Sequence, residues 1–347
     1  MGSSLSQLIN HQVRLASRPV GLARAENWQF TTEPVNEPVD GAVLVKTLAL
    51  SLDPAMRGWL NDGKSYIPPV GIGEVMRAGG IGRVVASKDP AFQPGDVVSG
   101  LLGVQEYSQA AAGLPGGRLQ KIDLRLGTPA QWLNVYGMPG MTAYFGLKDV
   151  GLPQAGQTLV VSGAAGAVGQ TVGQLARIWG MRAVGIAGGQ AKCDWVVREL
   201  GFDACIDYKG GSVRDGLKQH CPKGVDIYFD NVGGEILDHV LARLAPKARI
   251  VICGAISQYN NTTPIQGPKN YMSLLVNRAR MEGFVIFDYT ERFPQAIAEL
   301  AGYLTDGRLK SKEDIVEGGV QAFPQTLNKL FAGENFGKLV LRVAAES

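Results

Sequence analysis

The sequence is poor in the residues that build metal sites and disulfide frameworks. Its 347 residues include only 4 cysteines and 3 histidines. None of them forms a CxxC, HxxxH or HExxH pattern, so the usual spacing of metal ligands is missing. The cysteines fit reduced and buried thiols, which are typical of a cytoplasmic protein.

Strong net charge and long apolar runs are missing as well. The 34 lysines and arginines exceed the 31 acidic residues by 3, too small an excess for a protein that depends on a nucleic-acid backbone. No run of about 18 apolar residues occurs, and residues 1–10 lack the basic and apolar regions of a secretory signal. We therefore expect no nucleic-acid partner, no membrane insertion and a cytoplasmic location.

Glycine, by contrast, is abundant, with 46 of the 347 residues. This is roughly twice the average usage of about 7%. The length suggests two domains. Short strands at 41–50, 82–87 and 96–99, interrupted by glycine and proline, predict a mostly β domain in the first part. We place this domain at residues 1–127 and expect the helix and strand beyond Asp306 to return to it, so that 305–347 complete it.

From about Thr128 the pattern changes to short apolar runs that alternate with helix-length amphipathic segments. Such alternation predicts βαβ units with right-handed crossovers around a buried parallel sheet, that is, a doubly wound α/β domain over 128–304. The expected strands are 159–162, 182–187, 204–207, 226–230 and 249–253.

The first strand of this domain leads into a glycine-rich turn and then a helix. Ala164, Gly166 and Gly169 give an A-x-G-x-x-G pattern in the context that a dinucleotide site requires. Gly166 would let the backbone approach a pyrophosphate, Gly169 would let the helix pack on the strand, and the helix N-terminus would supply amide donors. Glycine-rich turns of this kind also occur for packing alone.

The second strand bears on the choice between NAD and NADP. An NAD site has an acid about 20 residues after the glycines, where a carboxylate bonds the ribose 2′-hydroxyl. Here the strand ends in Gly188 and Gly189, and Lys192 follows. The missing acid favours NADP, with Lys192 on the 2′-phosphate, whereas the alternative is a solvated lysine on a helix face.

Two further loops follow the fourth and fifth strands, at 230–234 and 253–260. Ligands bind outside the carboxyl ends of the strands in an open parallel sheet, so both loops would line one crevice. The alternative is ordinary loop chemistry, because Asn and Gly tolerate left-handed conformations.

Six separated segments together resemble one family, the zinc-independent branch of the medium-chain dehydrogenase/reductase superfamily. More narrowly, the chain is similar to leukotriene B4 12-hydroxydehydrogenases and prostaglandin reductases, and above all to bacterial curcumin reductase-like members. The resemblance extends from Arg14 to Val343. The segments are 50–58, 137–144, 188–193, 230–234, 253–260 and 335–338.

The resemblance implies a GroES-like, mostly β catalytic domain plus a Rossmann domain, NADP(H) as cofactor and a homodimer. Where zinc members carry a cysteine ligand this chain has Asp53-Pro54, and Gly73-Glu74 replaces their Gly-His-Glu motif. The implied enzyme therefore works without a metal.

The resemblance also assigns roles to individual residues. Gly189, Lys192 and Tyr208 match the 2′-phosphate corner, and a strand carrying Phe284, Val285 and Ile286 matches the segment that meets the nicotinamide carboxamide. Asn335 matches a cofactor-contacting asparagine in the returning tail. The remaining cofactor residues that it implies are Ala165, Gly166, Ala167, Val168, Gly169, Asn231, Cys253, Gly254, Ala255, Ile256, Ser257 and Tyr259.

The implied reaction is NADPH-dependent reduction of the carbon–carbon double bond of an α,β-unsaturated ketone or aldehyde. Without zinc, hydrogen-bond donors must stabilise the carbonyl oxygen. Tyr259, with the nicotinamide ribose hydroxyl, is the leading donor, and Tyr66 is a second candidate that could equally be a packing residue. Two alternatives stay open: a zinc-free quinone reductase or secondary alcohol dehydrogenase, and a non-catalytic NADP-binding protein.

Overall fold

A computed structural model describes residues 7–114 and 117–345, so the first six residues of the 1–10 segment discussed above lie outside it. The chain forms two compact units. The first unit contains Met1–Leu133, Glu313–Asn335 and Leu339–Ser347, and the second contains Asn134–Lys312 together with the tripeptide Phe336–Lys338. No helix in the described part of the chain has both the length and the apolarity needed to cross a bilayer.

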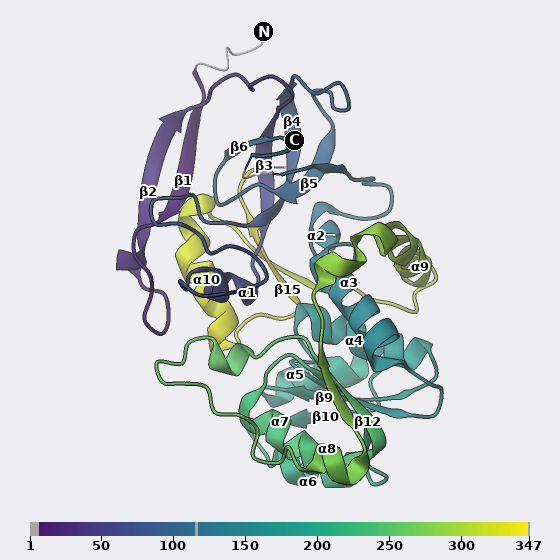
Figure 1. The fold of residues 1–347 in the computed structure, drawn as a ribbon. Helices are drawn as coiled ribbons and strands as arrows, with labels where there is room; N and C mark the ends of the chain where they lie inside the picture. Colours follow the sequence, from purple (N-terminus) through teal and green to yellow (C-terminus); the bar gives the residue numbers. More distant parts are fainter. Residues whose placement is uncertain (1–6, 115–116, 346–347) are drawn as a thin grey trace. The chain divides into compact units, whose positions relative to one another are not determined.

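The first unit is built on a seven-stranded sheet with the order β14-β15-β3-β4-β5-β7, in which β6 also pairs with β3 (Figure 1). Its C-terminal strand pairs antiparallel with β3 in the register Leu341 to Leu50, so the tail returns to this sheet. The elements of the unit are β1 (Ile9–Leu15), β2 (Trp28–Pro34), β3 (Val43–Ser51), α1 (Ala55–Trp59), β4 (Gly79–Ser87), β5 (Val97–Leu101), β6 (Tyr107–Ala110), β7 (Gln120–Lys121), α2 (Pro129–Trp132), β14 (Glu313–Val316), α10 (Phe323–Ala332) and β15 (Lys338–Arg342).

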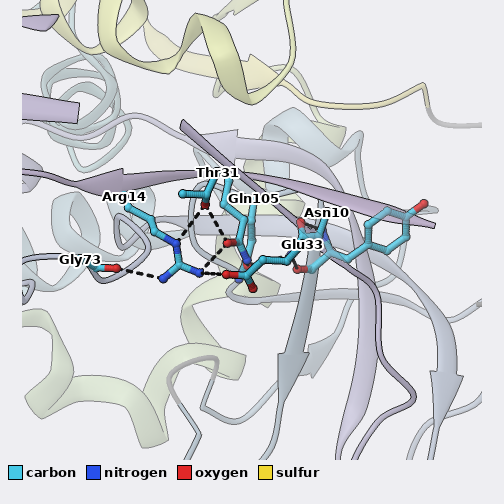
Figure 2. A network of polar contacts seen from close by, with 8 residues as sticks. Asn10, Arg14, Thr31, Glu33, Gly73 and Gln105 are labelled. Carbon is cyan, nitrogen blue, oxygen red and sulfur yellow. Dashed lines mark hydrogen bonds and ion pairs between the residues drawn. The ribbon is translucent and has the colours of Figure 1, made fainter. Parts of the chain in front are cut away.

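A separate two-stranded sheet of β1 and β2 is fixed by a polar network around Arg14 (Figure 2). Its guanidinium donates to Thr31 Oγ1 at 3.0 Å, to Glu33 Oε1 at 2.7 Å and to the carbonyl of Gly73 at 2.9 Å. Because one planar side chain bonds both strands and the loop that carries Gly73, it sets the position of that loop on the β1-β2 sheet.

The second unit contains a six-stranded sheet in which every pair is parallel. Its order is β10-β9-β8-β11-β12-β13, and Figure 1 labels β9, β10 and β12 of these strands. The elements are α3 (Met138–Phe145), β8 (Thr158–Ser162), α4 (Ala167–Ile178), β9 (Arg182–Ala187), α5 (Gln190–Arg198), β10 (Ala204–Asp207), α6 (Val213–His220), β11 (Val225–Asp230), α7 (Gly234–Leu241), β12 (Leu244–Ile252), α8 (Ser273–Asn277), β13 (Arg280–Gly283) and α9 (Phe293–Thr305).

Five of these strands match the runs expected from the sequence, and the sixth is β13, which lies before the 284–286 segment that the resemblance placed in a strand. The four residues of β13, Arg-Met-Glu-Gly, are mostly exposed and include two charged side chains, so the strand carries no apolar run that a sequence pattern would reveal. It lies at the edge of the sheet beside β12.

Helices cover both faces of this sheet because alternate residues of its strands point to opposite sides. Val184 shares a buried core with Leu217 of α6 and Val240 of α7. The neighbouring Gly185 faces Phe202, which also lies against Gly173 of α4. The result is a doubly wound α/β sheet whose strand order reverses between β8 and β11, the point at which ligands bind in such folds.

Candidate functional site

The glycine-rich turn between β8 and α4 lies at this switch point. Gly163 has φ +62°, and Gly166 is the N-cap of α4. A Cβ on Gly169 would lie 2.2 Å from the carbonyl oxygen of Gly163, so only glycine allows the helix to pack this closely on the turn. A Cβ on Gly166 would meet only the Gly163 oxygen, at 3.2 Å, so the backbone there is open to an incoming group.

This geometry fits a dinucleotide pyrophosphate. The first amides of a helix have no acceptor within the helix, and the helix N-terminus carries positive potential. In α4 these amides belong to Ala167, Val168 and Gly169, next to the open backbone of Gly166. The Gly166 N–H itself donates to the carbonyl of Gly163 at 2.9 Å. The amides of Ala167, Val168 and Gly169 would therefore be the donors to a pyrophosphate.

Asp230, at the end of β11, organises the neighbouring strand ends. Its side chain is buried, with 1% exposure. Its Oδ1 accepts four hydrogen bonds, at 2.8 to 3.1 Å, from Ser162 Oγ, Tyr228 OH and the amides of Val232 and Gly233. Burial raises the pKa of the Asp230 carboxyl, and these bonds oppose that rise.

The main chain around Asp230 joins three strand ends. Its carbonyl accepts from the amides of Cys253 at 2.9 Å and Gly254 at 3.1 Å, which follow β12. Asn231 donates from its side-chain amide to the carbonyl of Ser162 at 2.7 Å and from its backbone to Ser162 Oγ at 3.0 Å. The ends of β8, β11 and β12 therefore meet, and the expected crevice residues Asn231, Cys253 and Gly254 lie together.

The loop after β12 folds back over this junction. Ile256 N donates to the carbonyl of Asn231 at 3.2 Å, and Ser257 Oγ donates to the carbonyl of Val232 at 2.6 Å. The Tyr259 hydroxyl accepts from Ala255 N at 3.1 Å. This bond fixes the hydroxyl at the loop that follows β12.

The thiol of Cys253 is not a nucleophile in this crevice. Burial raises its pKa to about 12, with a further contribution from the Asp230 charge. At neutral pH the group is therefore a neutral thiol. Only a thiolate reacts or binds metal readily. Cys253 therefore contributes its backbone and its shape.

A second corner of the site forms between β9 and β10. A Cβ on Gly188 would lie 2.7 Å from the Tyr208 hydroxyl, so the two residues are in contact. Gly189, with φ +99°, is the N-cap of α5, and Lys192 lies in the first turn of that helix. The structure thus gathers Gly189, Lys192 and Tyr208, the residues expected at a 2′-phosphate, at one end of α5.

Asp207 belongs to this corner and was not expected from the sequence. Its Oδ1 accepts from Gly189 N at 2.7 Å and from Lys209 N at 2.9 Å. Burial alone would raise the pKa of the Asp207 carboxyl, but these amides and Lys209 bring it below its ordinary value. The carboxylate fixes the backbone of Gly189, which has a positive φ. The only feature of the sequence that could have pointed to Asp207 is that an acid ends the third strand.

The expectation that Phe284, Val285 and Ile286 lie in a strand is wrong. β13 ends at Gly283, the last residue that pairs with β12, and Ile286 begins a 3₁₀ helix over Ile286–Arg292. The Phe284 ring lies edge-on to Phe229, with ring centroids 6.4 Å apart. A Cβ on Gly146 would lie 2.5 Å from its ring, so aromatic packing rather than sheet pairing fixes this segment.

The predicted residues are divided between the two units. Tyr66 and Asn335 belong to the first unit, and all the other predicted site residues belong to the second. Tyr66 follows α1 in a loop, with 57% exposure. Within residues 7–114 and 117–345, no group of three His, Cys, Asp or Glu side chains could hold a metal ion.

The sheet order and the turn at its switch point define a dinucleotide-binding protein. A curcumin reductase of Escherichia coli, described as NADPH-dependent, is 43% identical over 342 residues, covering 97% of this chain and 98% of that protein. A 2-alkenal reductase of Nicotiana tabacum, described as NADP(+)-dependent, is 37% identical over 98% of this chain and 99% of its own length. The chain belongs to their family, within the zinc-independent branch of the medium-chain dehydrogenase/reductases, which confirms the expected family and fold class.

Family models and a solved structure agree with this assignment. Residues 11–120 match a model described as the N-terminal domain of oxidoreductase, and residues 167–302 match one described as zinc-binding dehydrogenase. The crystal structure of CurA from Vibrio vulnificus in complex with NADPH has a TM-score of 0.90 and 42% identity, covering 96% of this chain and 99% of that one.

Proposed function

We propose that the chain catalyses the NADPH-dependent reduction of the carbon–carbon double bond of α,β-unsaturated ketones or aldehydes. The observation that carries this function is the similarity, over nearly the whole chain, to the curcumin and 2-alkenal reductases. The NADP dependence of these relatives and the acid-free end of β9 support NADP(H) as the cofactor.

The hydride, the hydrogen bond to the carbonyl oxygen and the α-proton come from different groups in this reaction. NADPH, when bound, supplies hydride for the β-carbon of the substrate. The Tyr259 hydroxyl donates to the carbonyl oxygen as negative charge develops there, an interaction worth about 3 kcal/mol in such sites. Solvent delivers the α-proton, which completes the saturated ketone. Tyr66 stays a second candidate donor.

Incubation with NADPH and an aryl-substituted enone tests this function. We expect the absorbance of reduced nicotinamide to fall and a saturated ketone to form, with the matched saturated ketone giving no reaction. An allylic alcohol with the alkene intact would identify a carbonyl reductase, consumption of a quinone alone would identify a quinone reductase, and tight NADPH binding without turnover would identify a binding protein.

The cofactor assignment predicts the effect of Lys192→Ala. Hydrogen bonds between charged groups contribute about 1.5–3 kcal/mol, so loss of the ammonium should raise the Kd for NADPH about tenfold to a hundredfold. The Kd for NADH, which lacks the 2′-phosphate, should change less than about twofold. Titration of protein fluorescence with each cofactor measures both constants; equal effects would place the lysine away from the phosphate.

We further propose that the chain forms a homodimer through the edge of the second unit's sheet. β13 is an edge strand of the sheet, bonded to β12 on one side. The helix α8, next to β12 (Figure 1), exposes Leu275 by 70% and Val276 by 69%. Exposed apolar groups beside an open strand edge favour association with a second copy.

The variant Leu275→Glu/Val276→Glu is accordingly expected to convert a dimer to a monomer in size-exclusion chromatography with light scattering. Val39→Glu, at an exposed position of the first unit, is the control and should leave the dimer intact. A wild-type monomer, or a double variant that stays dimeric, would reject this interface.

The two compact units also support the proposal that residues 1–127 and 305–347 form the catalytic domain and that 128–304 form the NADP-binding domain. The free thiols Cys193, Cys205, Cys221 and Cys253 support a cytoplasmic location, where cysteines stay reduced.

A further inference from the structure

The returning tail contributes the tripeptide Phe336–Lys338 to the second unit. Gly337 N donates to the carbonyl of Ala165 at 2.8 Å, and Gly337 forms a parallel bridge with Gly166. Gly337 has φ +71°, and a Cβ there would lie 2.1 Å from the carbonyl oxygen of Lys312. The tail is therefore bonded to the glycine-rich turn itself, through a position that only glycine can occupy.

The preceding residue reaches the other phosphate corner. Lys192 Nζ lies over the Phe336 ring, 5.3 Å from its centroid. Trp195 meets the same ring edge-on, with centroids 6.1 Å apart and an interplanar angle of 78°. Lys192 and Trp195 are three residues apart on α5, so they share one face of that helix and hold Phe336 between them.

We propose that Phe336 is a specificity-determining residue that positions Lys192 for the 2′-phosphate of NADP(H). This inference rests on the proposed cofactor site. One aromatic ring orients the ammonium at the 2′-phosphate corner, while the next residue, Gly337, braces the turn for the pyrophosphate. The tail thus links the two phosphate sites, which lie at the N-termini of different helices.

The physical basis is the cost of ordering a lysine. A lysine side chain has four rotatable bonds, and much of its freedom is lost when its ammonium binds a phosphate. A ring face under the ammonium attracts the cation and restricts those rotamers beforehand. An ammonium over a ring also keeps N–H donors directed away from the ring, toward an anion.

The experiment compares two adenosine fragments that differ only in the 2′-phosphate, adenosine 2′,5′-bisphosphate and 5′-AMP, by isothermal titration calorimetry. Phe336→Leu keeps the apolar bulk and removes the ring, so binding of the bisphosphate should weaken about threefold to tenfold. Binding of 5′-AMP should change less than about twofold. Phe336→Tyr should behave as wild type, and Phe30→Leu, at an exposed position in β2, is the matched control.

Two further variants separate positioning from simple structural support. In a Lys192→Ala background, Phe336→Leu should have no further effect on the bisphosphate, because the ring acts through the lysine. Gly337→Ala should weaken both fragments alike, since it moves the turn. If Phe336→Leu does not fold, Trp195→Leu, which removes the edge contact of the ring, should show the same selectivity for the bisphosphate.

Equal weakening of both fragments by Phe336→Leu or Trp195→Leu, or an additive effect with Lys192→Ala, would overturn the proposal. Failure of the proposed function has a different result, namely no enone reduction by a wild-type protein that still shows the fragment pattern. Reduction of enones by a wild type in which Phe336→Leu shows no selectivity would reject only the role of Phe336.

Discussion

Asp230→Ala is expected to lower the free energy of unfolding by at least about 3 kcal/mol, because it leaves several buried donors without an acceptor, each costing about 1–3 kcal/mol. The Tyr228 hydroxyl, which is fully buried, and the amides of Val232 and Gly233 all donate to Asp230 Oδ1. The same bonds shape the loop that carries Asn231, so binding of NADPH should weaken as well. Urea unfolding and fluorescence titration measure the two effects.

Asp230→Asn is the matched control, because it keeps an oxygen where all four bonds converge. We expect a much smaller loss of stability than with alanine. The folded-state pKa of Asp230 is raised by burial, so its favourable contribution is complete when the carboxyl is protonated and is lost as pH rises through that pKa. The stability of wild type relative to Asp230→Asn should therefore improve from neutral to mildly acidic pH. Equal losses for both variants would show that Oδ1 does not organise the crevice.

The sequence predicted best where the signal was local. The turn from Gly163 to Gly169, the strand before it and the helix after it follow from residue types over about 20 positions. The alternating pattern of the second half likewise predicted five strands and the helices between them, and the structure contains these five strands. The roles of the individual site residues stay predictions, although the structure brings most of them together in the second unit.

What was missed depends on contacts between distant parts of the chain. Phe336 meets α5 about 140 positions earlier, and Gly337 bonds to Ala165. The residues around position 336 form no local pattern that predicts a contact with α5 or with Ala165. The family resemblance placed Phe284 in a strand, but its ring packs on Phe229 and the strand pairing stops one residue earlier. Local sequence patterns therefore predict which helices and strands form, whereas tertiary packing determines the residue at which each one ends.

Tyr259→Phe is expected to lower kcat for an enone by about 10²- to 10³-fold, the loss seen when a preorganised donor to a developing oxyanion is removed. The hydroxyl is held by Ala255 N at 3.1 Å, and a Cβ on Gly254 would lie 2.8 Å from it, so it is fixed before substrate arrives. Phenylalanine keeps the ring and leaves one amide without its acceptor. The Kd for NADPH should therefore rise by less than about tenfold, which separates catalysis from binding.

Tyr66→Phe discriminates between the two candidate donors. Tyr66 is exposed in a loop of the first unit, whereas the Tyr259 hydroxyl is bonded to Ala255 N in the loop that follows β12 in the second. If Tyr259 is the donor, Tyr66→Phe should keep kcat within about threefold of wild type, and stopped-flow measurement of hydride transfer should show the loss in Tyr259→Phe alone. If kcat falls in Tyr66→Phe and not in Tyr259→Phe, the role passes to Tyr66. Because phenylalanine replaces tyrosine at both positions, the comparison holds ring size constant and tests only which hydroxyl stabilises the oxyanion.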